Sequence, residues 1–217
     1  MKKIILFFLF TAQNIFSQAL IPNPPEVSAK SFLLIDAKTK TVITSNNPDE
    51  STGLASITKI MTSYVISDQI SKGFISDDSM VEISEECWRM EGSRMFIKEG
   101  TEVSVSELLK GMIIQSGNDA SCALAEKIAG SQSAFADLMN SYAEQLGLEN
   151  TNFVNPTGLP DINHYSTAND IAKLSIRLIE DFPDNYALFK EKEYTFNNIR
   201  QLNRNSILWQ DDSIDGI

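Results

Sequence analysis

Two residues with complementary chemistry, Ser56 and Lys59, stand three positions apart in the first third of the 217-residue chain. Residues with this spacing share one face of a helix, so the lysine amine can reach the serine hydroxyl. Apart from Tyr64, Lys59 is the only ionisable side chain between Glu50 and Asp68, which predicts apolar surroundings. Burial lowers the pKa of a lysine, and a free amine can accept the serine proton. The pair therefore predicts a serine nucleophile with a lysine general base.

The helix that would position this pair is predicted from the spacing of apolar residues. These side chains recur at i, i+3, i+4, i+7 and i+8, which is typical of one helix face: Ile57, Ile60, Met61, Tyr64 and Val65. Gly73 is expected to end the helix. Ser-x-x-Lys alone, however, is more often a helix start beside a solvated lysine. The assignment therefore needs a second motif.

A Ser-Gly-Asn triplet at 116–118 provides that second motif. Before it, a capping box that begins at Ser104 predicts a helix. After it, the apolar residues of 120–129 predict another helix, closed by Gly130. The triplet thus falls in a tight connection between two apolar helices, where its hydroxyl and amide can point into a cleft.

With both motifs present, the chain resembles the serine D-alanyl-D-alanine carboxypeptidases, which are low-molecular-mass penicillin-binding proteins related to the serine β-lactamases. The resemblance runs from Ser31–Asp36 through Leu54–Val65 and Gln115–Ala120 to Arg200–Asn205. It implies an α+β fold of the β-lactamase/transpeptidase type, with an N-terminal β-hairpin and a helical lobe.

The resemblance also implies roles for five residues. Ser56 corresponds to the acylated serine, Lys59 to its base, and Ser116 to the residue that relays a proton to the leaving amine. Asn118 would hydrogen-bond the bound peptide and help to fix Lys59, and Arg204 matches a position near the cleft. The implied reaction removes the terminal D-alanine from a peptidoglycan pentapeptide stem during cell-wall biogenesis. It needs no cofactor, and penicillin and other β-lactams inhibit it by acylating the serine.

The chain departs from the family pattern at its end. The family continues from Asp-Gly-Ile into Lys-Thr-Gly on a strand, whereas this chain stops at Asp215-Gly216-Ile217. The carboxylate anchor, one oxyanion N–H and the later strands of the sheet are therefore expected to be missing. A hairpin at 31–36 and 41–46 would then have an exposed edge. We expect a partial domain over residues 20–217 with little or no activity, or alternatively a non-catalytic wall-associated protein.

The N-terminus predicts export. A basic start at Met1–Lys3 precedes an apolar run at Ile4–Phe10 and small residues at Ser17–Ala19. This pattern is typical of a secretory signal peptide, here residues 1–19, and it is too short to span a membrane. The predicted location is the periplasm, including the periplasmic face of the inner membrane. Membrane attachment would need a segment beyond Ile217.

Composition excludes other partners. The net charge is −11 and the pI is about 4.6, and no basic cluster offers a nucleic-acid surface. No Cys/His cluster has the spacing of metal ligands, so a metal site is not expected. Cys87 and Cys122 could pair in an oxidising compartment. Cys122 lies in a predicted apolar helix, however, so a buried free thiol is the prediction.

Two other hydrolase classes fit the sequence less well. A Ser-His-Asp hydrolase would have to use His164, the only histidine, and the chain has no Gly-x-Ser-x-Gly elbow. We interpret His164 as a loop residue before a helix capped by Ser166 or Thr167. A class A β-lactamase shares Ser-x-x-Lys, but residues 151–165 contain no glutamate to activate the deacylating water. Penicillin is therefore expected to be an inhibitor rather than a substrate.

Overall fold

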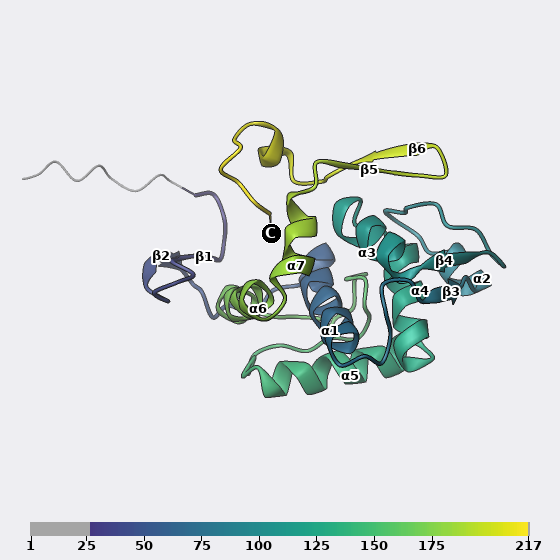
Figure 1. The fold of residues 1–217 in the computed structure, drawn as a ribbon. Helices are drawn as coiled ribbons and strands as arrows, with labels where there is room; N and C mark the ends of the chain where they lie inside the picture. The colour runs from purple at the N-terminus through teal and green to yellow at the C-terminus, as the bar shows by residue number, and fades with distance from the viewer. Residues whose placement is uncertain (1–26, 217) are drawn as a thin grey trace, which may run out of the picture.

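A computed structural model describes residues 27–216, so the predicted signal peptide lies outside the described residues. Helices surround one central helix, α1, and three two-stranded antiparallel sheets lie around them (Figure 1). This arrangement confirms the predicted α+β class. None of the helices in this part of the chain is long and apolar enough to cross a bilayer. The elements are β1 Phe32–Ile35, β2 Val42–Asn46, η1 Ala55–Thr58, α1 Lys59–Ser71, β3 Met80–Glu82, α2 Glu85–Trp88, β4 Glu102–Ser104, α3 Val105–Ile114, α4 Asn118–Ala129, α5 Gln132–Gln145, α6 Ala168–Asp181, α7 Pro183–Tyr186, η2 Ala187–Lys190, β5 Glu193–Phe196, β6 Ile199–Leu202 and η3 Ser206–Trp209.

The central helix is buried on all sides rather than on the single face that we predicted. Every residue of Lys59–Ser67 is buried, whereas Ile57, assigned to the apolar face, lies in the preceding η1 turn and is 50% exposed. Small hydroxyl residues fill the positions between the apolar ones, and Thr62 donates its hydroxyl hydrogen to the Pro156 carbonyl at 2.7 Å. A helix buried all round belongs to the centre of a core. It packs against α3, α4, α5 and α6.

The helix boundaries that the sequence predicts are confirmed. Ser104 caps α3 by accepting a hydrogen bond from the Glu107 N–H, and Thr167 caps α6 by accepting one from the Asp170 N–H. Gly130 ends α4 with a left-handed φ of 80°. Because α3 ends and α4 begins within four residues, the second motif lies in the tight connection that we expected.

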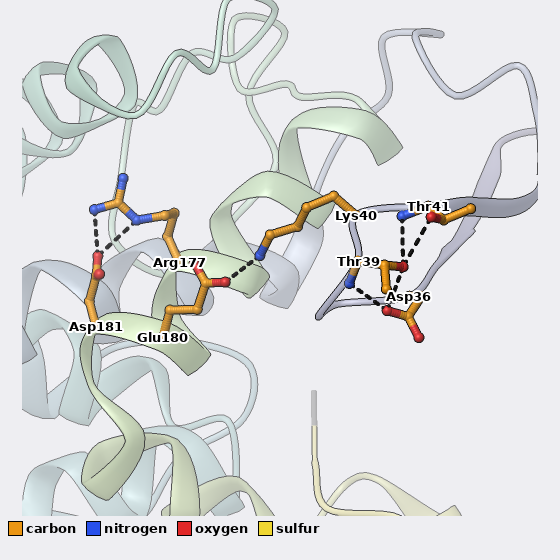
Figure 2. Close-up of polar contacts among 7 residues, drawn as sticks. All are labelled: Asp36, Thr39, Lys40, Thr41, Arg177, Glu180 and Asp181. Atoms are coloured by element: carbon orange, nitrogen blue, oxygen red, sulfur yellow. Dashed lines mark hydrogen bonds and ion pairs between the residues drawn. The ribbon is translucent and has the colours of Figure 1, made fainter.

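The N-terminal hairpin of β1 and β2 has an exposed edge, as the sequence predicts. Within residues 27–216 no third strand pairs with it. At its turn, the Asp36 carboxylate accepts hydrogen bonds from the Thr39 N–H and hydroxyl, and Lys40 forms an ion pair with Glu180 of α6 (Figure 2). The hairpin therefore contacts the helical lobe through α6. Its half-exposed apolar side chains are Leu34, Val42 and Ile43.

Helix α6 links this hairpin to the central helix. Arg177 donates hydrogen bonds to Asp181 one turn later at 2.7 and 3.0 Å (Figure 2). Asp181 also accepts the Tyr64 hydroxyl of α1 at 2.7 Å. Burial, together with this carboxylate, raises the pKa of Tyr64, so the phenol stays protonated. The protonated Tyr64 hydroxyl therefore attaches α1, the helix that carries Lys59, to Asp181 of α6.

The prediction of a free thiol at Cys122 is wrong. Cys87 of α2 and Cys122 of α4 form a disulfide, with both residues fully buried and their Cα atoms 5.3 Å apart, a separation within the usual disulfide range. The apolar side of α4 that suggested a buried thiol packs against α2. That contact joins residues 35 positions apart, and local spacing cannot reveal it.

Candidate active site

The serine of the first motif lies at the exposed end of the central helix. Ser56 is in the η1 turn just before α1, and its side chain is accessible. The preceding residue, Ala55, has a φ of 45°, a left-handed conformation that is rare for alanine. Gly158 packs so closely on the Ala55 carbonyl that a Cβ atom at position 158 would lie 1.8 Å from the oxygen. A strained turn braced by a distant loop therefore presents the hydroxyl.

The lysine is buried and bound by three acceptors. Lys59 is 5% exposed, and its Nζ donates to Asn118 Oδ1 at 2.8 Å and to the Thr157 carbonyl at 2.7 Å. The third contact, to Ser56 Oγ, is 3.4 Å long. The expected contact between serine and lysine is present. The lysine is buried, but the prediction that its surroundings are apolar is wrong, because the loop and α4 supply oxygen atoms to it.

Burial makes the lysine a weaker base than usual. Desolvation, and after it the charge of Arg204, lower the pKa of Lys59 to about 8, and Asp119 acts in the opposite direction. With a pKa of about 8, roughly one amine in ten is uncharged at pH 7, compared with roughly one in three thousand for an ordinary lysine. Lys59 can therefore accept a proton near neutral pH.

The second motif contributes the Asn118 amide, which is hydrogen-bonded, and the Ser116 hydroxyl, which is not hydrogen-bonded to any described residue. Asn118 donates from Nδ2 to the Glu91 carbonyl and from its backbone N–H to the Ser93 carbonyl, both at 2.7 Å. These bonds turn its Oδ1 toward Lys59. Ser116, at a left-handed φ of 63°, has a buried Oγ that makes no hydrogen bond with any described residue. A buried hydroxyl without a partner is rare and marks a position where a ligand or water can bind.

Asp119 supports this site, and sequence reasoning missed it. The side chain is 1% exposed, and its carboxylate accepts the N–H groups of Met95, Phe96 and Ile97 at 2.9, 2.9 and 3.3 Å. These bonds hold the loop at 89–97 against the first turn of α4, where a negative charge is favourable. The signal that could have found it is an aspartate in the first turn of a helix directly after the motif.

Arg204 lies at the edge of the same loop. Its Nη1 donates to Ser93 Oγ at 3.2 Å, and its backbone N–H donates to the Ile114 carbonyl. Ser93 in turn donates its hydroxyl hydrogen to the Gln115 carbonyl at 2.6 Å. The exposed guanidinium is thus placed beside the connection that carries the second motif. No hydrogen bond joins it to Lys59, and it acts on that lysine through its charge.

A cavity of about 450 Å³ adjoins the serine turn. Its lining is mostly apolar and comes from two segments, residues 53–55 and the loop at 158–164. None of Ser56, Lys59 and Ser116 lines this cavity, so the chemistry is inferred from the exposed hydroxyl and the buried, partly neutral amine, with which a serine can attack a carbonyl carbon. The arrangement is therefore suited to acyl transfer through a covalent serine intermediate.

Comparisons with known proteins agree with this chemistry. Residues 18–217 match the family model described as D-alanyl-D-alanine carboxypeptidase, Peptidase S11. The chain is 44% identical over 213 residues to D-alanyl-D-alanine carboxypeptidase DacA of Escherichia coli K12, covering 95% of this chain and 53% of that protein. The Haemophilus influenzae DacA is 44% identical over 190 residues, covering 86% and 48%.

Solved structures share the fold. Penicillin binding protein 5 from Haemophilus influenzae superposes with a TM-score of 0.87 at 43% identity, covering 90% of this chain and 58% of that one. Penicillin binding protein 6B from Escherichia coli gives 0.84 at 40% identity, covering 89% and 63%. The chain spans about half the length of the curated relatives it matches. It belongs to the D-alanyl-D-alanine carboxypeptidase family and has the α+β fold of penicillin-binding proteins.

Proposed function

We propose that the protein containing this chain is a serine D-alanyl-D-alanine carboxypeptidase that removes the terminal D-alanine from peptidoglycan pentapeptide stems. The observation that carries the proposal is the position of Lys59 Nζ between Ser56 Oγ and Asn118 Oδ1, in a site that lowers its pKa to about 8. The names of its relatives support the substrate class. Trimming a pentapeptide to a tetrapeptide removes a donor for cross-linking of the cell wall.

The mechanism assigns one task to each residue. Lys59 takes the Ser56 proton, and the serine oxygen attacks the carbonyl carbon of the penultimate D-alanine. The peptide bond breaks, and the terminal D-alanine leaves with a proton delivered through Ser116. Water then hydrolyses the ester on Ser56 and frees the tetrapeptide.

Asn118 can serve the base and the substrate at once. Its Oδ1 accepts from Lys59, and one Nδ2 hydrogen is bound by the Glu91 carbonyl. An amide nitrogen carries two hydrogens, so the second can bind a substrate carbonyl. Arg204, which is exposed and donates to Ser93, is proposed to attract the terminal carboxylate of the substrate as well as to lower the pKa of Lys59.

The proposed place of action is the periplasm, where peptidoglycan lies. Two observations support export: the signal-peptide pattern of residues 1–19 and the Cys87–Cys122 disulfide. Structural disulfides persist in oxidising compartments and are rare in the cytosol.

A labelled penicillin tests the assignment in the complete gene product. The label is expected on Ser56 in the wild type and on no residue in Ser56→Ala. Ser71→Ala is the matched control, because Ser71 is an exposed serine at the far end of α1. Release of D-alanine from a pentapeptide should be lost in the same variant. Labelling that persists in Ser56→Ala would refute the role of Ser56, and a wild type that neither takes up label nor releases D-alanine would favour the non-catalytic alternative.

A further inference from the structure

His164, which the sequence suggested was an ordinary loop residue, is buried with both ring nitrogens engaged. It lies in the loop before α6 as expected, but it is only 3% exposed. Nε2 is 2.7 Å from Thr58 Oγ1, and the Val154 N–H donates to Nδ1 at 3.2 Å. The edge of the ring packs on Phe153, with ring centroids 5.8 Å apart.

These contacts fix the protonation state of the ring. A backbone N–H can only donate, so Nδ1 must be the acceptor and carries no proton. The hydrogen of a neutral imidazole is then on Nε2 and points to the Thr58 oxygen. Only the neutral ring satisfies both contacts, because an imidazolium would place an Nδ1–H against the Val154 N–H.

The ring closes a loop that holds the catalytic lysine. His164 and Val154 are the two ends of a segment whose middle lies on the serine turn. There the Thr157 carbonyl accepts from Lys59 Nζ at 2.7 Å, and Gly158 packs on the Ala55 carbonyl. The segment is braced internally, since a single side chain, Asn155, accepts the N–H groups of both Thr157 and Gly158.

The other end of the imidazole reaches the serine turn itself. Thr58 stands between Ser56 and Lys59 in sequence, and its side chain is fully buried. Its hydroxyl is the partner of His164 Nε2. The ring of His164, at the end of the loop, thus connects Val154 at the start of the loop to the turn that presents the nucleophile and the base.

We propose that His164 is a positioning residue, which holds the segment at 154–164 against the Ser56–Lys59 turn and so keeps the Thr157 carbonyl on the lysine amine. The inference rests on the proposed function, because it concerns the rate at which Ser56 is acylated. His164 does not touch the reacting atoms and acts through Thr58 and Val154.

The charges around the ring are consistent with a neutral histidine. Burial lowers the pKa of His164, and Asp161 on the same loop opposes this effect. Lys59, next to Thr58 on the turn, is the charged group on the helix side. Because the pKa lies below the ordinary 6.5, the neutral form and its two hydrogen bonds persist as the pH falls to 6.5. Below that value the unfolded chain takes up a proton first, so stability declines with further acidification.

Four variants of the complete gene product separate positioning from simple stability. His164→Phe keeps a ring and removes both nitrogens, Thr58→Val removes the hydroxyl at similar volume, and His164→Gln keeps a donor toward Thr58. We expect acylation by a labelled penicillin to slow about 10- to 100-fold in the first two, the size of effect known for small misplacements of catalytic groups. His164→Gln should recover most of the rate. Leu178→Ala, a fully buried truncation in α6, should lower the melting temperature without slowing acylation of the folded protein.

Nuclear magnetic resonance measures which ring nitrogen carries the proton, and a side chain that only fills space would not fix this state. The imidazole of His164, assigned by its loss in His164→Phe, should show a protonated Nε2 and an unprotonated Nδ1 at pH 7. A proton on Nδ1, or wild-type acylation rates in His164→Phe and Thr58→Val, would overturn the inference and leave the proposed function standing. A wild-type protein that no penicillin acylates would overturn the proposed function and this inference with it.

Discussion

Reduction of the Cys87–Cys122 disulfide should destabilise the protein by about 4 kcal/mol. The two cysteines are 35 positions apart, and the chain-entropy relation for a closed loop of that length gives about 3.8 kcal/mol at 25 °C. For a domain of this size that loss corresponds to a fall of roughly 8–16 °C in melting temperature. A buried free thiol at Cys122, which the sequence suggested, would predict no effect of a reductant.

Reduction of the disulfide should affect the active site less than it affects the stability of the whole protein. The disulfide fixes α2 at the start of the loop at 89–97, but Asp119 still holds the end of that loop and Asn118 still donates to Glu91 and Ser93. We therefore expect the folded, reduced protein to be acylated at more than about a tenth of the oxidised rate, since the contacts that orient Asn118 persist.

Denaturant unfolding with and without reductant measures the main effect. The matched control is the Cys87→Ser, Cys122→Ser double variant, whose unfolding free energy should be low and should not respond to reductant. Unchanged stability of the wild type on reduction, or alkylation of both thiols in the native, unreduced protein, would refute the disulfide and the reasoning built on it.

Two substitutions test how the site is braced. Gly158→Ala should lower stability by about 1–3 kcal/mol and slow acylation at least tenfold, because the residue has a φ of 83° and the new Cβ would lie 1.8 Å from the Ala55 oxygen. The control is Gly53→Ala, because no atom lies within 4 Å of a Cβ added at that position. Equal stability and equal acylation rates of the two variants would contradict the packing of Gly158 on Ala55. Asp119→Asn should lower the unfolding free energy by about 1–3 kcal/mol, since an amide cannot accept all the N–H groups that the carboxylate accepts around Phe96, and unchanged denaturant midpoints would contradict that role.

The helices of this fold could be predicted because their signals are local. The capping box at Ser104, the cap at Thr167 and the glycine at position 130 each act within one turn of the helix they bound. The single apolar face assigned to the central helix was wrong, because periodicity does not show that small hydroxyl residues such as Thr62 can be buried too when a carbonyl from a distant loop binds them.

Strands and long-range pairs were harder to predict. The antiparallel pairing of β3 with β4 and the disulfide both join residues that are distant in sequence. The hairpin of β5 and β6 did carry a local signal that we did not use: Asn197 and Asn198 both adopt left-handed φ values, 46° and 62°, as a two-residue hairpin turn requires.

Half of the candidate site could likewise be predicted. The contact between Ser56 and Lys59 follows from the spacing of one motif, whereas the contact between Lys59 and Asn118 is implied by the family resemblance. Thr157 and His164 have no such motif, since the first contributes a backbone carbonyl and the second acts through burial. Their parts depend on how the loop at 154–164 folds over the serine turn.

The proposed chemistry requires that the buried Lys59 amine is partly uncharged near neutral pH. Titration of that side chain by nuclear magnetic resonance of isotope-labelled lysine, assigned by comparison with Lys59→Ala, measures it directly. We predict a midpoint near pH 8, with the rate of Ser56 acylation rising as the pH increases through the same value. A midpoint near 10.5, the ordinary value for lysine, would contradict it.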